Sequence, residues 1–584
     1  MRTLRIFRRI VVYYREHIPG TVVGSLCVAG SGLVALQAPA LVRHAVDGIQ
    51  AGKPLAETAT YAGLLLAVAV VAGFFLFAQR RILVGISRHI EHRLRTDLYA
   101  HVLRLPPQFF MGQRVGDLLT RAVSDVGTVR SAVGPAWMYA LNTVIVLIAG
   151  TILMARIHPL LTVLALSVLP LVAVTTRIFG TRIHRRWGQA QEQLSTLTAR
   201  VQEHLVGLRV LRAFTCESTE IERMAALSQE YLRANARLIR IQSLFHPLLQ
   251  LLIGTASVVV LGVGGSLVQK NSLTLGQFVE FNLYLVRLVW PMIAVGWVAN
   301  LVQRGAASME RIEELFSQPV LADAAEVSPA ETQRGAAATF DLKGVSFSYP
   351  GAGRPALQDV SLSAEPGQRI AIVGAVGSGK STLLALLPRL LEAVHGRIQV
   401  DGIDLRAQPL SRIRTEVALV PQGSFLFSAT LRENIALARP DAAPDEIMQA
   451  AMAAGLGDDL SRFPDGLETL VGERGVTLSG GQRQRVAIAR ALVMHPRLLL
   501  LDDCLSAVDT ATEQEILKNL PNTTLVFATH RLAAAELCDY VIVLEEGRVV
   551  ECGSPNELAA LEGHYARLLR LQRLAEPVDL ASSA

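Results

Sequence analysis

Residues 374–381 combine glycine, lysine and serine in an order that binds phosphate groups. The run fits the pattern G-x-x-x-x-G-K-[ST] and lies between an apolar stretch at 369–373, predicted as a strand, and a helical run at 382–391. Its glycines let backbone N–H groups face the phosphates, while Lys380 reaches the β- and γ-phosphates and Ser381 offers its hydroxyl to Mg²⁺. The residues predicted to contact a nucleotide here are Gly374, Gly377, Ser378, Gly379, Lys380, Ser381 and Thr382.

A second motif, Leu-Ser-Gly-Gly-Gln at 478–482, argues against the alternative that the first is a plain glycine turn. Such a fixed pentapeptide should arise by chance in a chain of this length only about once in a thousand. It is the signature of ATP-binding cassette proteins, a family that the chain resembles over nearly its whole length. The resemblance implies an ATPase with ATP and Mg²⁺ as cofactors. It also implies that signature residues cap the γ-phosphate bound by a partner's cassette, namely Ser479, Gly480, Gly481 and Gln482.

The resemblance assigns roles to residues at the ends of predicted strands. Tyr349, at the end of a strand at 338–349, resembles the aromatic residue that stacks on adenine, although an ordinary strand tyrosine is the alternative. Gln422, after a strand at 416–421, looks like the glutamine that senses Mg²⁺ and the γ-phosphate and contacts the membrane domain.

Three further residues follow the same logic. Asp502 would hold Mg²⁺ through water, together with Ser381 and Gln422, and Asp509 resembles the loop residue that signals between two ATP sites. His530, after a strand at 524–529, resembles the switch histidine that steadies the γ-phosphate.

Asp503 departs from the family pattern. A Glu normally follows the strand that ends in Asp502 and activates the attacking water, so we expect a weakened hydrolytic site here. Subunits of bacterial heterodimeric exporters carry the same Leu-Asp-Asp, which implies a partner half-transporter that supplies the Glu. A second departure is Leu470, where exporters usually have Glu.

Composition places the cassette on a membrane domain. The 584 residues are 51% hydrophobic and 18% charged, which is too apolar for an ordinary soluble enzyme. Residues 1–316 carry 32 Lys and Arg against 17 Asp and Glu, whereas residues 317–584 carry 24 against 33. The basic half is explained by loops on the cytoplasmic side of a bilayer, and it gives no reason to expect a nucleic acid partner.

Six apolar segments are each near the ~20 residues needed to span a bilayer. They are 22–46, 61–84, 136–157, 160–179, 248–268 and 278–301. The connections after the second and fourth segments are long and rich in Arg, which places them, and both termini, in the cytoplasm. The run 57–105 reads as one helix of about 49 residues and about 73 Å, far longer than a bilayer core.

The predicted fold is a membrane α-helical domain of the type IV exporter kind followed by an α/β P-loop nucleotide-binding domain. Its parts are a transmembrane domain at 1–316, a linker at 317–337, the cassette at 338–575 and a disordered tail at 576–584. The basic start resembles an interfacial elbow helix. The segments 116–126 and 212–223 look like the two cytoplasmic coupling segments. The five cysteines form no CxxC pair, so neither a disulfide nor a zinc site is implied.

The favoured function is an ATP-driven exporter of small amphipathic, lipid or drug-like molecules in the bacterial inner membrane. A homodimer with a slow ATPase and an importer of siderophores or metal complexes built on the exporter fold stay open. A channel or sensor would need inserted regulatory segments, which are not visible. Substrate identity is beyond the sequence.

Arg287 lies about 13 residues and about 20 Å into the last predicted membrane helix, where a cation is costly. Glu280, two turns earlier, is too far away for a direct pair on an ideal helix. Pairing with a carboxylate on another segment and a role in a cavity for anionic or amphipathic substrates are equally open interpretations.

Overall fold

The computed structural model describes residues 2–321, 337–472, 475 and 478–575. The chain divides into two compact units, one formed by 1–103 and 115–318 and the other by 104–114 and 319–584. Most of the predicted linker and the whole predicted tail lie outside the described residues.

The first unit is entirely helical in its described part. Within that part, six helices are long and apolar enough to cross a membrane, at 18–50, 55–103, 115–157, 159–206, 217–269 and 275–316. These confirm the six predicted segments and extend each of them. The helix bounds are α1 Arg2–Arg15, α2 Ile18–Ala35, α3 Ala38–Gln50, α4 Leu55–Gln79, η1 Arg80–Val84, α5 Gly85–Leu103, α7 Val115–Thr120, η2 Arg121–Asp125, α8 Val126–Val133, α9 Pro135–Ile157, α10 Pro159–Leu166, α11 Leu169–Val206, α12 Leu208–Ala213, α13 Glu217–Val259, η3 Val260–Gly264, α14 Gly265–Gln269 and α15 Leu275–Phe316.

The second spanning helix has the predicted length of 49 residues, at 55–103. One turn of it, η1, is a π-helix, as are η2 and η3 in two other spans. Such turns insert one residue into an α-helix, and hydropathy patterns do not reveal them.

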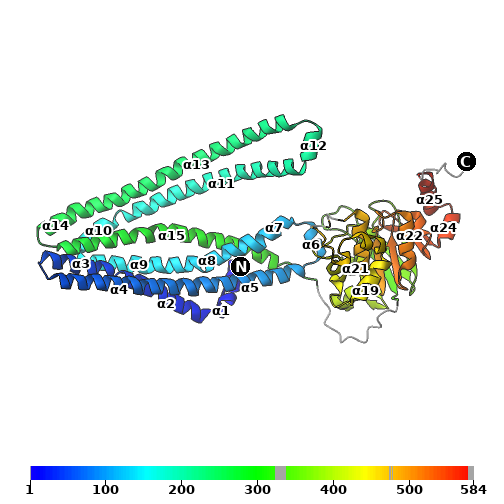
Figure 1. Cartoon of the computed structure of the whole chain (residues 1–584), viewed down its shortest axis with the longest axis horizontal. Helices are drawn as coiled ribbons and strands as arrows, with labels where there is room; N and C mark the ends of the chain where they lie inside the picture. The colour runs from blue at the N-terminus through cyan, green and yellow to red at the C-terminus, as the bar shows by residue number, and fades with distance from the viewer. Residues whose placement is uncertain (1, 322–336, 473–474, 476–477, 576–584) are drawn as a thin grey trace. The chain divides into compact units, whose positions relative to one another are not determined.

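α11 and α13 pack against each other and form a long hairpin that α12 closes (Figure 1). The end of the hairpin that carries α12 diverges from α15, whereas its other end packs on the remaining helices. α15 packs against α3, α8 and α9, which makes it the central helix of the rest of the unit. A buried cluster around Phe281, Tyr284 and Leu288 of α15 forms the core there.

The second unit contains two sheets. The larger has the strand order β10-β9-β3-β8-β7-β6, in which all neighbours are parallel except β10 and β9. The smaller has the order β2-β1-β4-β5 and is antiparallel. The strand bounds are β1 Phe340–Phe347, β2 Leu357–Ala364, β3 Arg369–Val373, β4 His395–Val400, β5 Ile403–Asp404, β6 Val417–Val420, β7 Leu498–Asp502, β8 Thr524–Ala528, β9 Tyr540–Glu545 and β10 Arg548–Gly553.

Short helices cover these sheets. The bounds are α6 Pro107–Met111, α16 Lys380–Leu386, η4 Leu405–Ala407, α17 Leu410–Glu416, α18 Leu431–Ile435, η5 Ala436–Ala438, α19 Pro444–Ala453, α20 Gly457–Arg462, η6 Gly466–Glu468, α21 Gly480–Leu492, α22 Thr510–Asn519, α23 Leu532–Ala535, α24 Pro555–Ala560 and α25 His564–Ala575. α16 is shorter than the predicted helix at 382–391. It ends just before Leu387, because Pro388 lacks the N–H that a continuing α-helix would need.

α6 belongs to the second unit although the first unit surrounds it in sequence. The segment that joins the second unit is therefore 104–114, which precedes the first coupling segment predicted at 116–126. The structure folds that predicted segment as α7 and η2 of the first unit.

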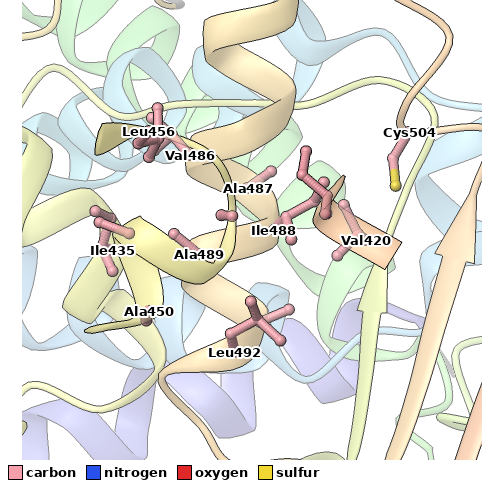
Figure 2. Packing of buried hydrophobic residues seen from close by; sticks show 14 of the residues in the cluster. Val420, Ile435, Ala450, Leu456, Val486, Ala487, Ile488, Ala489, Leu492 and Cys504 are labelled. Atoms are coloured by element: carbon pink, nitrogen blue, oxygen red, sulfur yellow. The ribbon is translucent and has the colours of Figure 1, made fainter. Parts of the chain in front are cut away.

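α21 is anchored in the interior of the second unit. Its Val486, Ile488, Ala489 and Leu492 point into a buried cluster that also takes Ile435 from α18 (Figure 2). Because its apolar face is held along several turns, the polar first turn of α21 has a fixed position.

Candidate nucleotide-binding and hydrolytic site

The candidate site is built at one edge of the larger sheet. β3, β8, β7 and β6 are parallel neighbours, so their carboxyl ends meet at the same edge. The phosphate loop follows β3, His530 follows β8, Asp503 follows β7 and Gln422 follows β6. Four sequence motifs that are distant along the chain are thus brought to one place.

The phosphate loop needs its glycines for steric reasons. Gly374 has φ 153°, and a Cβ there would lie 2.2 Å from the carbonyl oxygen of Leu544. Gly379 has φ 106°, and its Cβ would lie 2.7 Å from the carbonyl oxygen of Ala356. Since neither obstacle is a flexible side chain, the loop conformation excludes any larger residue at these two positions.

Lys380 is poised over this loop. Its ammonium donates hydrogen bonds of 2.9 Å to the carbonyl oxygens of Gly374 and Ala375. Burial lowers the pKa of Lys380, an effect that the charges of Asp503 and Asp502 oppose. Ser378 Oγ is buried and has no hydrogen-bond partner among the described residues. A buried hydroxyl without a partner and a desolvated ammonium both fit a phosphate group as their ligand.

The Mg²⁺ ligands predicted from the sequence are partly assembled. Ser381 Oγ donates a 3.0 Å hydrogen bond to Asp502 Oδ1, at the end of the fully buried strand β7. Burial raises the pKa of Asp502, and the hydrogen bond from Ser381 opposes that rise. Among the described residues, no group of three or more His, Cys, Asp and Glu could hold a metal alone. A hydroxyl and one carboxylate suit Mg²⁺, which keeps waters and takes substrate phosphates as further ligands.

Asp503 adopts a left-handed backbone conformation, with φ 45°. Its N–H donates to the carbonyl oxygen of Ala528 at 2.9 Å, which ties the end of β7 to β8. Its Oδ2 accepts a 3.2 Å hydrogen bond from Gln422 Nε2. The structure therefore joins the two predicted residues Gln422 and Asp503 directly.

Tyr349 and His530 lie beside the loop. The hydroxyl of Tyr349 and Thr382 Oγ1 are 3.0 Å apart, which places the predicted adenine-stacking residue next to the first turn of α16. His530 is exposed and lines a cavity of about 240 Å³ together with Gly374 and Ala375.

The signature residues begin α21. Ser479 caps the helix, since its Oγ accepts from the N–H of Gln482 at 3.2 Å and its own N–H donates to Gln482 Oε1 at 2.9 Å. A Cβ on Gly481 would lie 2.9 Å from the carbonyl oxygen of Ala507, whereas one on Gly480 would meet only the Ala507 side chain at 3.5 Å. Within the chain, the signature thus packs against the loop that leads to Asp509.

Asp509 is the N-cap of α22 in this structure. Its Oδ1 accepts a 2.9 Å hydrogen bond from the N–H of Thr512, and this bond holds the pKa of Asp509 below its usual value. Its carboxylate is otherwise exposed.

Sequence reasoning missed two residues that fix the loop between Asp503 and Asp509. Gln484 Oε1 accepts from the N–H of Ala507 at 3.0 Å. Arg531 donates to the carbonyl oxygens of Ser506 and Val508 at 2.9 and 2.7 Å, and it pairs with the buried Glu513 at 2.8 Å. Two sequence signals could have indicated them: Gln484 is a polar residue on the buried face of α21, and Arg531 directly follows His530.

Comparisons with known proteins agree with this geometry. A family model described as "ABC transporter transmembrane region" matches residues 21–292, and one described as "ABC transporter" matches residues 357–506. The multidrug resistance-like ATP-binding protein MdlA of Escherichia coli is 35% identical over 99% of this chain and 98% of its own length. The probable multidrug resistance ABC transporter protein YheI of Bacillus subtilis is 37% identical over 92% of both chains.

Two further likenesses concern lipid transport and fold. An ATP-dependent lipid A-core flippase of Dechloromonas aromatica is 32% identical over 99% of both chains. A bacterial Atm1-family ABC exporter solved with ATP bound has a TM-score of 0.77 and 28% identity, and the match covers 96% of this chain and 98% of that one.

Proposed function

The chain belongs to the ATP-binding cassette transporters, and we propose that it is the half of a heterodimeric exporter that carries the slow ATP site. The family membership makes it a multi-pass membrane ATPase of the exporter type. The assembly, the direction of transport and the location in a bacterial inner membrane with both termini in the cytoplasm belong to the proposal. Relatives named for multidrug resistance and for lipid A-core flipping support amphipathic cargo.

In this proposal the phosphate loop and Lys380 bind the phosphates of ATP, and Ser381 with Asp502 holds Mg²⁺. When bound there, Mg²⁺ would neutralise charge on the phosphates. His530 and Gln422 contact the γ-phosphate and the attacking water. The signature at Ser479–Gln482 serves the site on the partner's cassette.

The position and length of Asp503 are the observation that carries the proposal. Its backbone is fixed by the bond to Ala528, so its carboxylate falls about 1.5 Å, one C–C bond, short of the reach of a Glu. A general base must lie within hydrogen-bond distance of the water that it polarises. Asp503 Oδ2 also accepts a hydrogen bond from Gln422, which lowers its capacity to accept from a water. We therefore expect ATP to bind at this site and to turn over slowly.

The test compares two catalytic positions in the same purified heterodimer. Replacing the partner's catalytic Glu by Gln should nearly stop ATPase and transport, whereas Asp503→Glu should change the rate less than about threefold. Asp503→Asn is the matched control, because it removes the charge at constant size and should also leave most of the activity.

Two outcomes would contradict the proposal. One is the loss of most ATPase in Asp503→Asn, which would make Asp503 a working base. The other is transport and hydrolysis at ordinary exporter rates by this chain purified alone, which would favour a homodimer.

A further inference from the structure

A cavity of about 350 Å³ lies in the first unit and is lined by residues of α2, α3, α4 and α15. α2 and α3 form one span, which packs against α4, and α3 also packs against α15. Its wall consists of Ala, Val, Leu and Pro side chains, with one exception. The exception is Arg287, from α15. The volume lies in the range of sites that bind small molecules, and such sites are mostly apolar with a few polar groups that orient the ligand.

Arg287 lies well inside the apolar span. It follows the first residue of α15 by twelve positions, or about 18 Å along the helix axis. A guanidinium at that depth is expected to face a cavity or to pair with an acid, because hydrocarbon does not solvate it.

Within the part of the chain that the structure describes, Arg287 is unpaired. Among the described residues it donates no hydrogen bond and forms no ion pair, and its side chain is exposed. Glu280, two turns earlier on α15, is 5% exposed and pairs instead with Arg43 of α3 at 3.4 Å. The carboxylate on its own helix is thus already engaged with α3. Within this chain, the structure favours the cavity interpretation of Arg287 over the pairing interpretation.

We propose that Arg287 is the anion-binding residue of a substrate subsite in this cavity. The ligand class is an amphipathic molecule with a hydrocarbon or aromatic body and a carboxylate, phosphate or sulfonate group. The aliphatic wall takes the body, and the planar fork of the guanidinium takes two oxygens of the anion. This inference rests on the proposed export function, since it names the chemistry of the cargo.

The binding test uses two probes with the same body, dansyl-undecanoic acid and its methyl ester. Titrations are performed on the full transporter, purified with its partner in phosphatidylcholine nanodiscs. The parent should bind the acid at least tenfold tighter than the ester. Arg287→Gln should reduce this ratio to less than twofold, and Arg287→Lys should keep part of it because it keeps the charge.

A second variant examines the cavity without changing Arg287. Ala69→Phe, on α4, fills part of the cavity and should weaken the acid and the ester by similar factors. If Arg287→Gln fails to assemble, Arg287→Lys and Ala69→Phe still decide the question. Loss of the acid preference in the lysine variant to the level of the ester, or unchanged binding of both probes in Ala69→Phe, would overturn the subsite.

Nanodiscs that contain phosphatidylglycerol distinguish the two sources of the anion. Competition with the acid in the parent but not in Arg287→Gln would identify an anionic lipid headgroup, whereas absence of competition would identify a free amphipath. An equal ratio of acid to ester affinity in the parent and in Arg287→Gln would refute the proposal. This is the result expected if an acidic residue of the partner subunit pairs with Arg287. Because these are binding measurements without ATP turnover, their failure is separate from a failure of the proposed export function.

Discussion

Arg531 connects the segment after β8 to the loop between Asp503 and Asp509, and its removal should weaken the nucleotide-binding unit measurably. Its guanidinium holds two backbone carbonyl oxygens, of Ser506 and Val508, and one carboxylate, of Glu513. The Glu513 side chain is 2% exposed and that of Arg531 is 33% exposed.

The magnitude follows from this burial. Removing one partner of a buried ion pair costs about 3–5 kcal/mol, and the partial exposure of Arg531 reduces the expectation for Arg531→Ala to about 2–3 kcal/mol. For a domain of this size, 1 kcal/mol shifts the unfolding midpoint by about 2–4 °C. The midpoint of this unit should therefore fall by about 4–12 °C in the intact transporter. ATPase activity should fall too, because two carbonyl contacts of the loop are lost.

The pH dependence gives an independent check. Burial raises the pKa of Glu513, and Arg531 opposes that rise. Without Arg531 the pKa rises further. A buried carboxyl with a raised pKa in the folded state does not destabilise the protein while it is protonated at low pH. As the pH rises through its folded-state pKa, the carboxyl becomes charged and the free energy of unfolding falls. The stability deficit of Arg531→Ala should therefore be larger at pH 8 than at pH 5.5.

The assay is thermal unfolding in nanodiscs at both pH values. The double variant Arg531→Ala, Glu513→Gln is the matched control and should recover most of the lost midpoint, since it removes the unpaired carboxylate. A shift below about 1 °C, or a shift that neither pH nor Glu513→Gln changes, would refute this account of the Arg531 contacts.

Two further predictions concern nucleotide and coupling residues. Tyr349→Ala should weaken ATP binding by about 5- to 150-fold, the range expected for one base stacked on an aromatic ring. Tyr349→Phe should change ATP binding by less than about threefold, because it loses only the contact with Thr382. Equal effects of the two variants in a fluorescent ATP titration would exclude stacking. Phe214 is 75% exposed at the end of α12. Phe214→Ala should leave ATP binding unchanged, and it should lower substrate-stimulated ATPase and transport together. Leu232→Ala, an equally apolar change at a 65% exposed site on α13, should not, and unaltered transport in Phe214→Ala vesicles would rule out a coupling role.

The strands and motifs of the nucleotide site could be predicted because their signals are local. An apolar run that ends in a glycine turn or a carboxylate defines β3 and β7; the structure gives β3 its predicted bounds and ends β7 at Asp502, as predicted. The length of the 55–103 helix was equally readable, since apolar and amphipathic periods continue through it.

The remaining features depend on packing between distant segments. Gln484 and Arg531 were missed because their partners lie about twenty residues away, in a loop whose path is not a sequence pattern. The pairing state of Arg287 could not be predicted, because it depends on which helix lies next to Glu280. The π-helical turns left no sign in composition, since one inserted residue does not alter an apolar run.

The pairing of α3 with α15 also sets an order of events during synthesis. Asp47 accepts hydrogen bonds from Thr274 Oγ1 and from the N–H of Gly276, a residue 229 positions later in the chain. At about 5–20 residues per second, a ribosome needs roughly 10–50 s to reach that partner. The delay between the translation of Arg43 and that of its partner Glu280 is about the same. Until α15 is made, Arg43 and Asp47 have only each other as the partner that the structure shows, with Nε and Oδ2 3.7 Å apart across one helical turn, so the contacts that tie the first hairpin to the last helix form only when the final span is complete.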